Sequence, residues 1–381
     1  MISRKKTWWI WAIVALIWLR LLFLLLAAYN IPPTGTITET GWFPHGGDEQ
    51  GYFSSAEKLL KSQFMRKAHP LGFSLVLAPL ILFLQPQNII DISRPVMVLN
   101  SVLFYTLAVV LVYLLAKKII GGKKRALLIA GFFTIYPYLY YGYFHFFSSL
   151  AGHKVSRFLQ LMFLQIASDP LSTILVLASL LLILKINKRN LGLCFALGLI
   201  TGLAFITRVQ NAALLPVYSL VLLFGLGAKR IEQGFENALY FVLGALPPVV
   251  FQFYVNYMAN GSLFKTAYGL KKGPDYSIDM VGLKYPLRLI TYPARHSPLL
   301  FAPMALVIIL IILGIVRIVK RNKKQGIILS AYFLASAIPI AFLEPTFRNP
   351  RYFLPVIPLV FIFVWLGLEQ LVSYVRAKPK Q

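Results

Sequence analysis

The sequence predicts an all-α fold, a polytopic bundle of about ten transmembrane helices, and three observations support this prediction. Hydrophobic residues make up 58% of the 381-residue chain and charged residues only 13%, and the mean hydropathy is +0.72. Apolar runs of about 20 residues recur, and this length crosses the ~30 Å hydrocarbon layer of a bilayer. Lysines and arginines gather in the short segments between these runs, as they do in cytoplasmic loops. We therefore expect a single integral membrane domain over residues 1–381.

The first apolar run, from Thr7 to Ala28, is interpreted as a retained span. It is too long for a signal peptide, and no small-residue cleavage site follows it. Leu71–Leu84 is the ambiguous run, because it is short and has prolines at positions 70, 79 and 86. The other spans are expected at roughly 94–116, 125–146, 168–186, 191–206, 211–228, 236–257, 298–317, 326–343 and 352–372.

The placement of the basic clusters decides how Leu71–Leu84 is interpreted. If this run crossed the membrane, the basic loops would no longer share one side with the basic amino terminus. If it stays on the outer side as an interfacial or re-entrant helix, all the clusters face the cytoplasm. We therefore predict a multi-pass protein of the cell membrane with both termini cytoplasmic. The clusters are Arg4–Lys6, Lys117–Arg125, Lys185–Arg189, Lys229–Arg230, Arg317–Lys324 and Arg376–Lys380.

The net charge of +26 does not indicate a nucleic-acid partner, because these clusters lie where the positive-inside rule puts them. Positive charge at such places also suits membrane lipids with anionic headgroups. The single cysteine, Cys194, lies in an apolar run and excludes both an intramolecular disulfide and a cysteine-based metal cluster. No His-x-x-x-His or Asp-x-Asp spacing is present, so the sequence identifies no cofactor. A divalent metal is compatible with the sequence but not supported by it.

Carboxylates gather on the expected outer side, which comprises residues 29–93, 147–167, 258–297 and 344–351. The positive-inside rule ignores acidic residues, so it does not explain this placement, and we interpret it as the sign of a functional site. Nine of the twelve acidic residues lie on that side or at its edge: Glu39, Asp48, Glu49, Glu57, Asp91, Asp169, Asp275, Asp279 and Glu344.

Asp48 and Glu49 follow His45-Gly46-Gly47 and open a helix-like stretch from Gln50 to Arg66. Its apolar residues recur every three or four positions, which predicts an amphipathic helix lying in the interface. Asp48 has two interpretations. It is either a helix cap or a general base that acts on a hydroxyl at the bilayer edge.

Several motifs follow in a characteristic order. Asp48-Glu49 precedes Tyr52 and Ala56, and His69-Pro70-Leu71-Gly72 then opens a short apolar helix. Ile92-Ser93-Arg94-Pro95 and Ser168-Asp169-Pro170-Leu171 each enter a later span, and Arg351-Tyr352-Phe353-Leu354-Pro355 enters the last one. In order, spacing and membrane side, this chain resembles the GT-C superfamily of membrane glycosyltransferases. It is most similar to the protein O-mannosyltransferase and aminoarabinose transferase branch.

The likeness is clearest over residues 1–230, which would form the catalytic module, and residues 231–381 would add C-terminal spans and the outer loop 258–297. The resemblance implies a sugar donor carried on polyprenyl phosphate, and an acceptor hydroxyl of a lipid, glycan or protein. It implies an inverting single displacement on the outer face of the membrane. Asp48 would be the base, Glu49 would support its loop, and Asp169 would be a second carboxylate near the same site. Asp169 can equally be an N-cap before Pro170 at the first helical position.

His69 occupies a place where relatives often have lysine or histidine, so it is assigned to the donor phosphate. A solvated or capping histidine is the alternative. Arg348 and Arg351, together with Tyr352, form a second candidate for phosphate binding, because the planar fork of arginine can donate two parallel hydrogen bonds. The alternative there is a basic loop beside an aromatic-belt tyrosine.

Arg208 and Arg20 lie in or beside apolar spans, where an arginine is costly and usually faces a partner or a cavity. Both are therefore candidate substrate-binding residues, although Arg20 could instead snorkel outward. The length of the 258–297 loop suits an acceptor-binding lid. Two other functions stay open, a transporter or lipid flippase and a non-catalytic membrane scaffold. A transporter is expected to show internal repeats and polar groups at mid-membrane, and this sequence shows neither clearly apart from Arg20.

Overall fold

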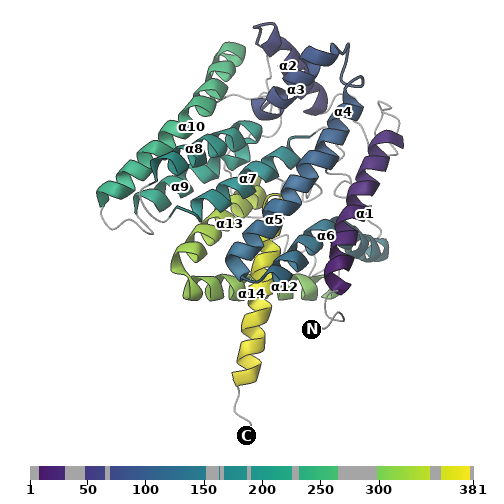
Figure 1. The fold of residues 1–381 in the computed structure, drawn as a ribbon, viewed down its shortest axis with the longest axis vertical. Helices are drawn as coiled ribbons and strands as arrows, with labels where there is room; N and C mark the ends of the chain where they lie inside the picture. Colours follow the sequence, from purple (N-terminus) through teal and green to yellow (C-terminus); the bar gives the residue numbers. More distant parts are fainter. Residues whose placement is uncertain are drawn as a thin grey trace, which may run out of the picture. The chain divides into compact units, whose positions relative to one another are not determined.

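The computed structural model describes nine parts of the chain and confirms the all-α class for them. The described residues are 87% helical and contain no strand (Figure 1). They are residues 8–30, 48–64, 69–151, 163, 167–186, 190–224, 231–264, 298–343 and 353–377.

The chain divides into two compact units, each built from separate stretches of sequence. Unit 1 comprises Met1–Trp18, Val109–Leu159 and Ile278–Gln381, and unit 2 comprises Leu19–Ala108 and Gln160–Ser277. Helices α1 (Trp8–Asn30) and α5 (Tyr105–Ile120) contribute residues to both units. Unit 1 also contains α6 (Lys123–Ala151), α12 (Pro298–Arg321), α13 (Lys323–Leu343) and α14 (Ile357–Ala377). The expected division at residue 230 differs from this grouping, because helix α10 belongs to unit 2.

Unit 2 begins with the short helices α2 (Asp48–Leu60), α3 (Leu71–Leu84) and α4 (Ser93–Val98). A π-helical turn (η2, Leu99–Phe104) joins α4 to α5. The later helices are α7 (Asp169–Ile183), α8 (Leu191–Thr207), the 3₁₀ turn η4 (Val209–Ala213), α9 (Leu214–Leu223) and α10 (Ile231–Asn260).

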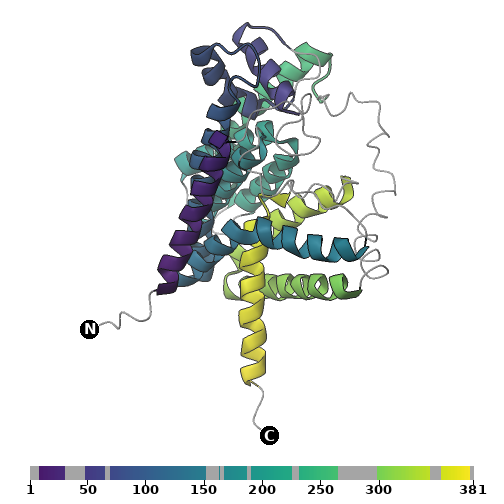
Figure 2. The ribbon, with the colours of Figure 1, turned by 90° about the vertical axis from the view of Figure 1, so that its right-hand side faces the viewer.

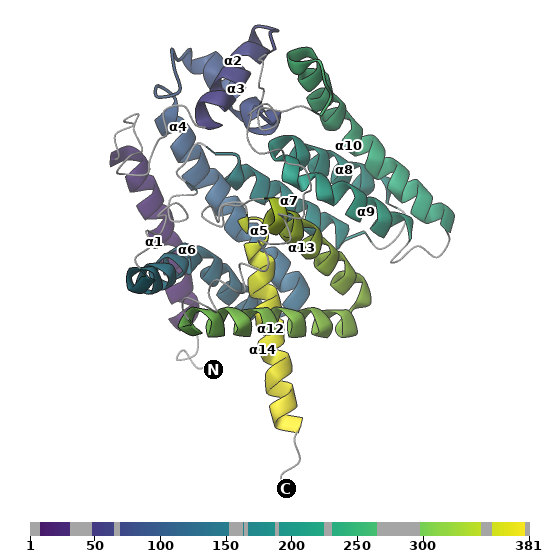
Figure 3. The ribbon, with the colours of Figure 1, turned by 180° about the vertical axis from the view of Figure 1, so that it is seen from behind.

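Helices α8 and α10 pack closely enough for their backbones to touch, and Figure 3 shows them side by side with α9. A Cβ atom at Gly198 of α8 would clash with the backbone of α10, and a Cβ at Gly244 of α10 would clash with the backbone of α8. Small residues allow this approach, which is how apolar helices associate where water supplies no driving force. In unit 1, Gly314 of α12 and Gly367 of α14 allow the same approach where these two helices cross (Figure 2).

Within the part of the chain that the structure describes, three helical stretches are long and apolar enough to cross a membrane: Ser93–Ile120, Ile231–Asn260 and Ile357–Arg376. They indicate a membrane protein. Each of the ten spans expected from the sequence overlaps a helix, but several helices are shorter than 18 residues, so the count of ten stays a prediction. Of the span expected at 211–228, the structure describes residues 211–224, which include the end of η4 and the ten-residue helix α9.

The short helix expected at Leu71–Leu84 is present with those bounds as α3. The amphipathic helix expected from Gln50 to Arg66 begins at Asp48 and ends at Leu60, so its predicted end was wrong. The cause is a turn at Ser62, whose φ of 53° is left-handed. The backbone N–H groups of Ser62 and Gln63 bond to the carbonyls of Leu59 and Lys58, which closes the helix before residue 64.

Candidate functional site

The first turn of α2 carries the two neighbouring carboxylates singled out in the sequence. Asp48 is half-buried, whereas Glu49 is only 6% exposed. Both lie at the amino end of the helix, where the helix dipole and the unbonded backbone N–H groups favour negative charge. Asp48 is thus the more accessible of the two, and Glu49 faces the interior of unit 2.

His69 lies against the next turn of the same helix. Its ring centroid is 5.3 Å from that of Tyr52, and a Cβ atom at position 51 would overlap the imidazole. Gly51 is therefore what lets the histidine approach the α2 backbone. Tyr52 also packs edge-on against Phe73 of α3, with 5.4 Å between ring centroids. These contacts place His69 about one helical turn from Asp48 and Glu49.

A hydrogen bond ties α2 to the start of α7. The Tyr52 hydroxyl lies 3.0 Å from Ser168 Oγ, and both residues are buried. Ser168 is the residue before Asp169, which begins α7. Helix α2 and the Ser168-Asp169-Pro170 motif, 116 residues apart in sequence at this hydrogen bond, therefore meet in space.

Asp169 and Arg208 form a buried ion pair between their side chains. The Asp169 side chain is 2% exposed and that of Arg208 is 11% exposed. Asp169 occupies the first helical position, Ser168 is the N-cap, and no side-chain capping hydrogen bond forms there. The N-cap interpretation of Asp169 is thus replaced by an ion pair, and Arg208 acquires a partner that the sequence did not indicate.

Arg208 is held in place by its backbone neighbours as well as by Asp169. It lies between α8 and η4 in an extended conformation, with φ −150° and ψ 123°. Just beyond it, the Asn211 side-chain amide donates to Ser172 Oγ and to the Ala204 carbonyl oxygen, both at 2.8 Å. This amide fastens the segment that carries Arg208 to α7 and α8.

Helix α3 is fixed from two sides. At Gly72, any Cβ would clash with Thr207, the residue before Arg208. At Leu71, the backbone N–H donates to Gln252 Oε1 of α10 at 2.9 Å, and the Gln252 amide donates in turn to Asn256 Oδ1 at 2.9 Å. The amino end of α3, next to His69, is therefore held against both α8 and α10.

Arg20 is buried in unit 2 at 5% exposure rather than snorkelling. Its guanidinium carbon lies 5.9 Å from the centre of the Tyr105 ring, a cation–π contact. Three other predicted residues, Arg348, Arg351 and Tyr352, lie outside the described residues, as does most of the 258–297 loop. No group of three potential metal ligands occurs within the described ranges.

The sequence singled out Asp48, Glu49, His69, Asp169 and Arg208 separately. In the structure they all lie in unit 2, in or directly beside α2, α3, α7 and α8. The sequence did not reveal the residues that hold this arrangement together. Asn211, Gln252 and Asn256 are amides in otherwise apolar helices or turns, and the i, i+4 spacing of the last two was a readable signal.

No protein-family model, curated protein or solved structure matches this chain.

Proposed function

We propose that this chain is a membrane glycosyltransferase that moves a sugar from a polyprenyl-phosphate donor to an acceptor hydroxyl on the outer face of the membrane. The observation that carries the proposal is the convergence of the accessible Asp48 turn with His69 and the Asp169–Arg208 pair, made through the contact between Tyr52 and Ser168. A carboxylate, an imidazole and a guanidinium on neighbouring elements are the groups that such a transfer needs.

Asp48 is the base in this mechanism. Its carboxylate takes the proton of the acceptor hydroxyl while that oxygen forms a bond to the anomeric carbon. The bond from the anomeric carbon to the phosphate oxygen breaks on the opposite face, and the lipid phosphate leaves with the electron pair. Asp48 suits this role better than Glu49, because it is the less buried of the two carboxylates.

The leaving phosphate needs charge stabilisation more than protonation. Arg208 is suited to this, because a guanidinium carries several N–H donors in a planar fork that matches the oxygens of a phosphate. His69, two residues before the start of α3, can add a second contact. Asp169 is then a positioning residue, because a buried carboxylate paired to an arginine is poorly placed to accept a proton from substrate. Arg348, Arg351 and Tyr352 stay predicted phosphate ligands.

The topology is part of the proposal. Helices α2 and α3 would lie on the outer side, and both termini in the cytoplasm. The carboxylates Asp48, Glu49, Glu57, Asp91 and Asp169 would then share the outer side, since they belong to the α2–α4 region and the start of α7. The lysine-rich ends of α5 and α12 would then face the cytoplasm.

The test is transfer by purified protein in liposomes that contain radiolabelled polyprenyl-phosphate sugars and a panel of lipid, glycan and peptide acceptors. We expect label to move covalently to one acceptor class, and Asp48→Asn to slow this transfer at least about a hundredfold. Glu57→Gln is the matched control, because Glu57 lies on the same helix, with a side chain that is 42% exposed and paired with Lys61 at 2.7 Å.

Full transfer by Asp48→Asn would show that Asp48 is not the base. Passage of the intact lipid-linked sugar across the bilayer, with no covalent transfer, would instead identify a flippase. If neither occurs with any donor and acceptor, the proposed function is wrong and a scaffold becomes the better interpretation.

A further inference from the structure

Cations crowd around two turns of unit 1, between α5 and α6 and between α12 and α13, and we call this region the basic end. Glu369 is the only acidic residue among the residues of unit 1 that the structure describes. It supplies one negative charge against ten positive charges. The ten cations are Lys117, Lys118, Lys123, Lys124, Arg125, Arg317, Lys320, Arg321, Lys323 and Lys324.

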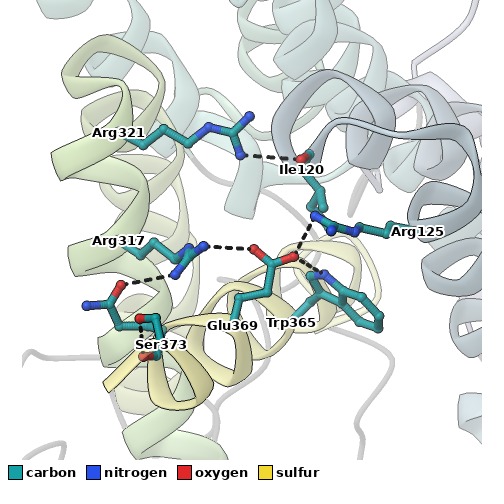
Figure 4. A network of polar contacts seen from close by, with 8 residues as sticks. Ile120, Arg125, Arg317, Arg321, Trp365, Glu369 and Ser373 are labelled. Carbon is teal, nitrogen blue, oxygen red and sulfur yellow. Dashed lines mark hydrogen bonds and ion pairs between the residues drawn. The ribbon is translucent and has the colours of Figure 1, made fainter. Parts of the chain in front are cut away.

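The Glu369 carboxylate is already fully engaged, as Figure 4 shows. Its Oε1 atom accepts from Arg125 at 2.8 Å and from Trp365 Nε1 at 2.9 Å. Its Oε2 atom lies 3.2 Å from the Arg317 guanidinium. This carboxylate therefore joins α6, α12 and α14 but offsets only a small part of the surrounding positive charge.

Arg321 joins the two turns. Its guanidinium donates to the Ile120 carbonyl oxygen, at the end of α5, over 3.3 Å (Figure 4). The next two residues, Gly121 and Gly122, have φ of 75° and 82°, values that favour glycine. Gly122 is exposed, and among the described residues no atom beyond its chain neighbours lies within 4 Å of where its Cβ would be. The α5–α6 turn is thus open to solvent or lipid and bordered by cations of both turns.

The charges of two lysines from different turns, Lys118 and Lys324, oppose each other. Burial lowers the pKa of Lys324, and the charge of Lys118 lowers it further. An anion bound beside both ammonium groups would relieve this repulsion.

We propose that the basic end binds the phosphate headgroup of an anionic phospholipid. A lipid suits it better than a soluble anion, because aliphatic side chains of α12 stand exposed in the turns that lead up to Arg317. An acyl chain can lie along these side chains while its headgroup phosphate meets the cations. The exposed aliphatic residues are Leu306, Val307, Ile308, Ile309, Ile312 and Val316.

The test measures lipid retention by native mass spectrometry of protein extracted from nanodiscs that contain phosphatidylglycerol and phosphatidylcholine. Lys118→Gln and Lys324→Gln remove these two charges singly and together. Lys185→Gln is the matched control, since this exposed lysine follows the end of α7 in unit 2 and is predicted to lie on the same membrane side. We expect each site substitution to lower the preference for phosphatidylglycerol about fivefold, and the control to leave it nearly unchanged.

Three outcomes would overturn the proposal. An equal loss in Lys185→Gln would mean a diffuse surface potential rather than a site. The absence of any preference for phosphatidylglycerol in the unmodified protein would mean that no anionic lipid is selected. Competition by inorganic phosphate as effective as by phosphatidylglycerol would identify a soluble-anion site. Because Lys324 is half-buried, Lys118→Gln with the exposed Lys323→Gln provides a second variant, and gel filtration checks that each is folded.

Discussion

Replacing Arg208 with methionine should destabilise unit 2 far more than the loss of one surface ion pair would. The change removes the partner of Asp169 and leaves a carboxylate at 2% exposure without its counter-charge. Breaking a buried pair from one side costs about 3–5 kcal/mol, because the remaining charge stays buried and uncompensated. Methionine keeps much of the volume of the arginine stem, so loss of packing contributes little to this figure.

Arg125→Met is the matched control for this prediction. The Arg125 side chain is 53% exposed, and Glu369 keeps Arg317 and Trp365 as partners after the change. An exposed pair of this kind contributes about 0–1 kcal/mol. The assay is unfolding in mixed micelles titrated with sodium dodecyl sulfate and followed by circular dichroism. Equal midpoints for the two variants would refute the conclusion that Arg208 neutralises a buried charge.

Three further perturbations separate other parts of the structure. Gly198→Ala should destabilise the protein by about 1–3 kcal/mol in the same titration, because the added Cβ would meet the α10 backbone. Gly192→Ala, on the exposed side of α8, is the control and should be neutral or stabilising. Tyr52→Phe removes the hydroxyl that joins α2 to α7 at a cost of about 1 kcal/mol, and it should slow transfer without unfolding the protein. In NMR of ¹³C-methylated lysines, Lys324 should titrate below its ordinary pKa of 10.5, and Lys118→Gln should raise the lowered pKa. Because the folded state disfavours the charged amine, the free energy of unfolding should rise as pH increases from the lowered pKa to the ordinary one. A Lys324 signal unmoved by Lys118→Gln would mean that the two charges do not interact.

Local patterns in the sequence predicted the helices well and their ends less well. Helix α3 was predicted with the right bounds because Pro70 and Pro86 delimit its apolar run. The end of α2 was missed because Ser62 adopts a left-handed conformation that is more typical of glycine or asparagine. The described part of the 211–228 span divides into η4 and α9, where Arg208 and Asn211 bind α7, and no local pattern reveals contacts of that kind.

The candidate site shows the same limit more sharply. Asp169 and Arg208 each stood out, one by motif and the other by its place beside an apolar run. Their pairing joins positions 39 residues apart, and only the packing of α7 against α8 reveals it. The amide of Gln252, which accepts the first N–H of α3, was likewise invisible as a partner because α10 is remote in sequence.

Stability alone does not explain why Asp169 and Arg208 form a buried pair. Replacing both members of such a pair with apolar residues of similar size is often neutral or stabilising, because the desolvation of two charges offsets much of their attraction. The double variant Asp169→Leu with Arg208→Met should therefore unfold close to the unmodified protein, although Arg208→Met alone should not. If Arg208 binds the donor phosphate, that stable double variant should still fail to transfer sugar. A double variant that is both stable and fully active would mean that the pair only joins α7 to α8, and the phosphate role would then pass to His69 and to the predicted ligands Arg348 and Arg351.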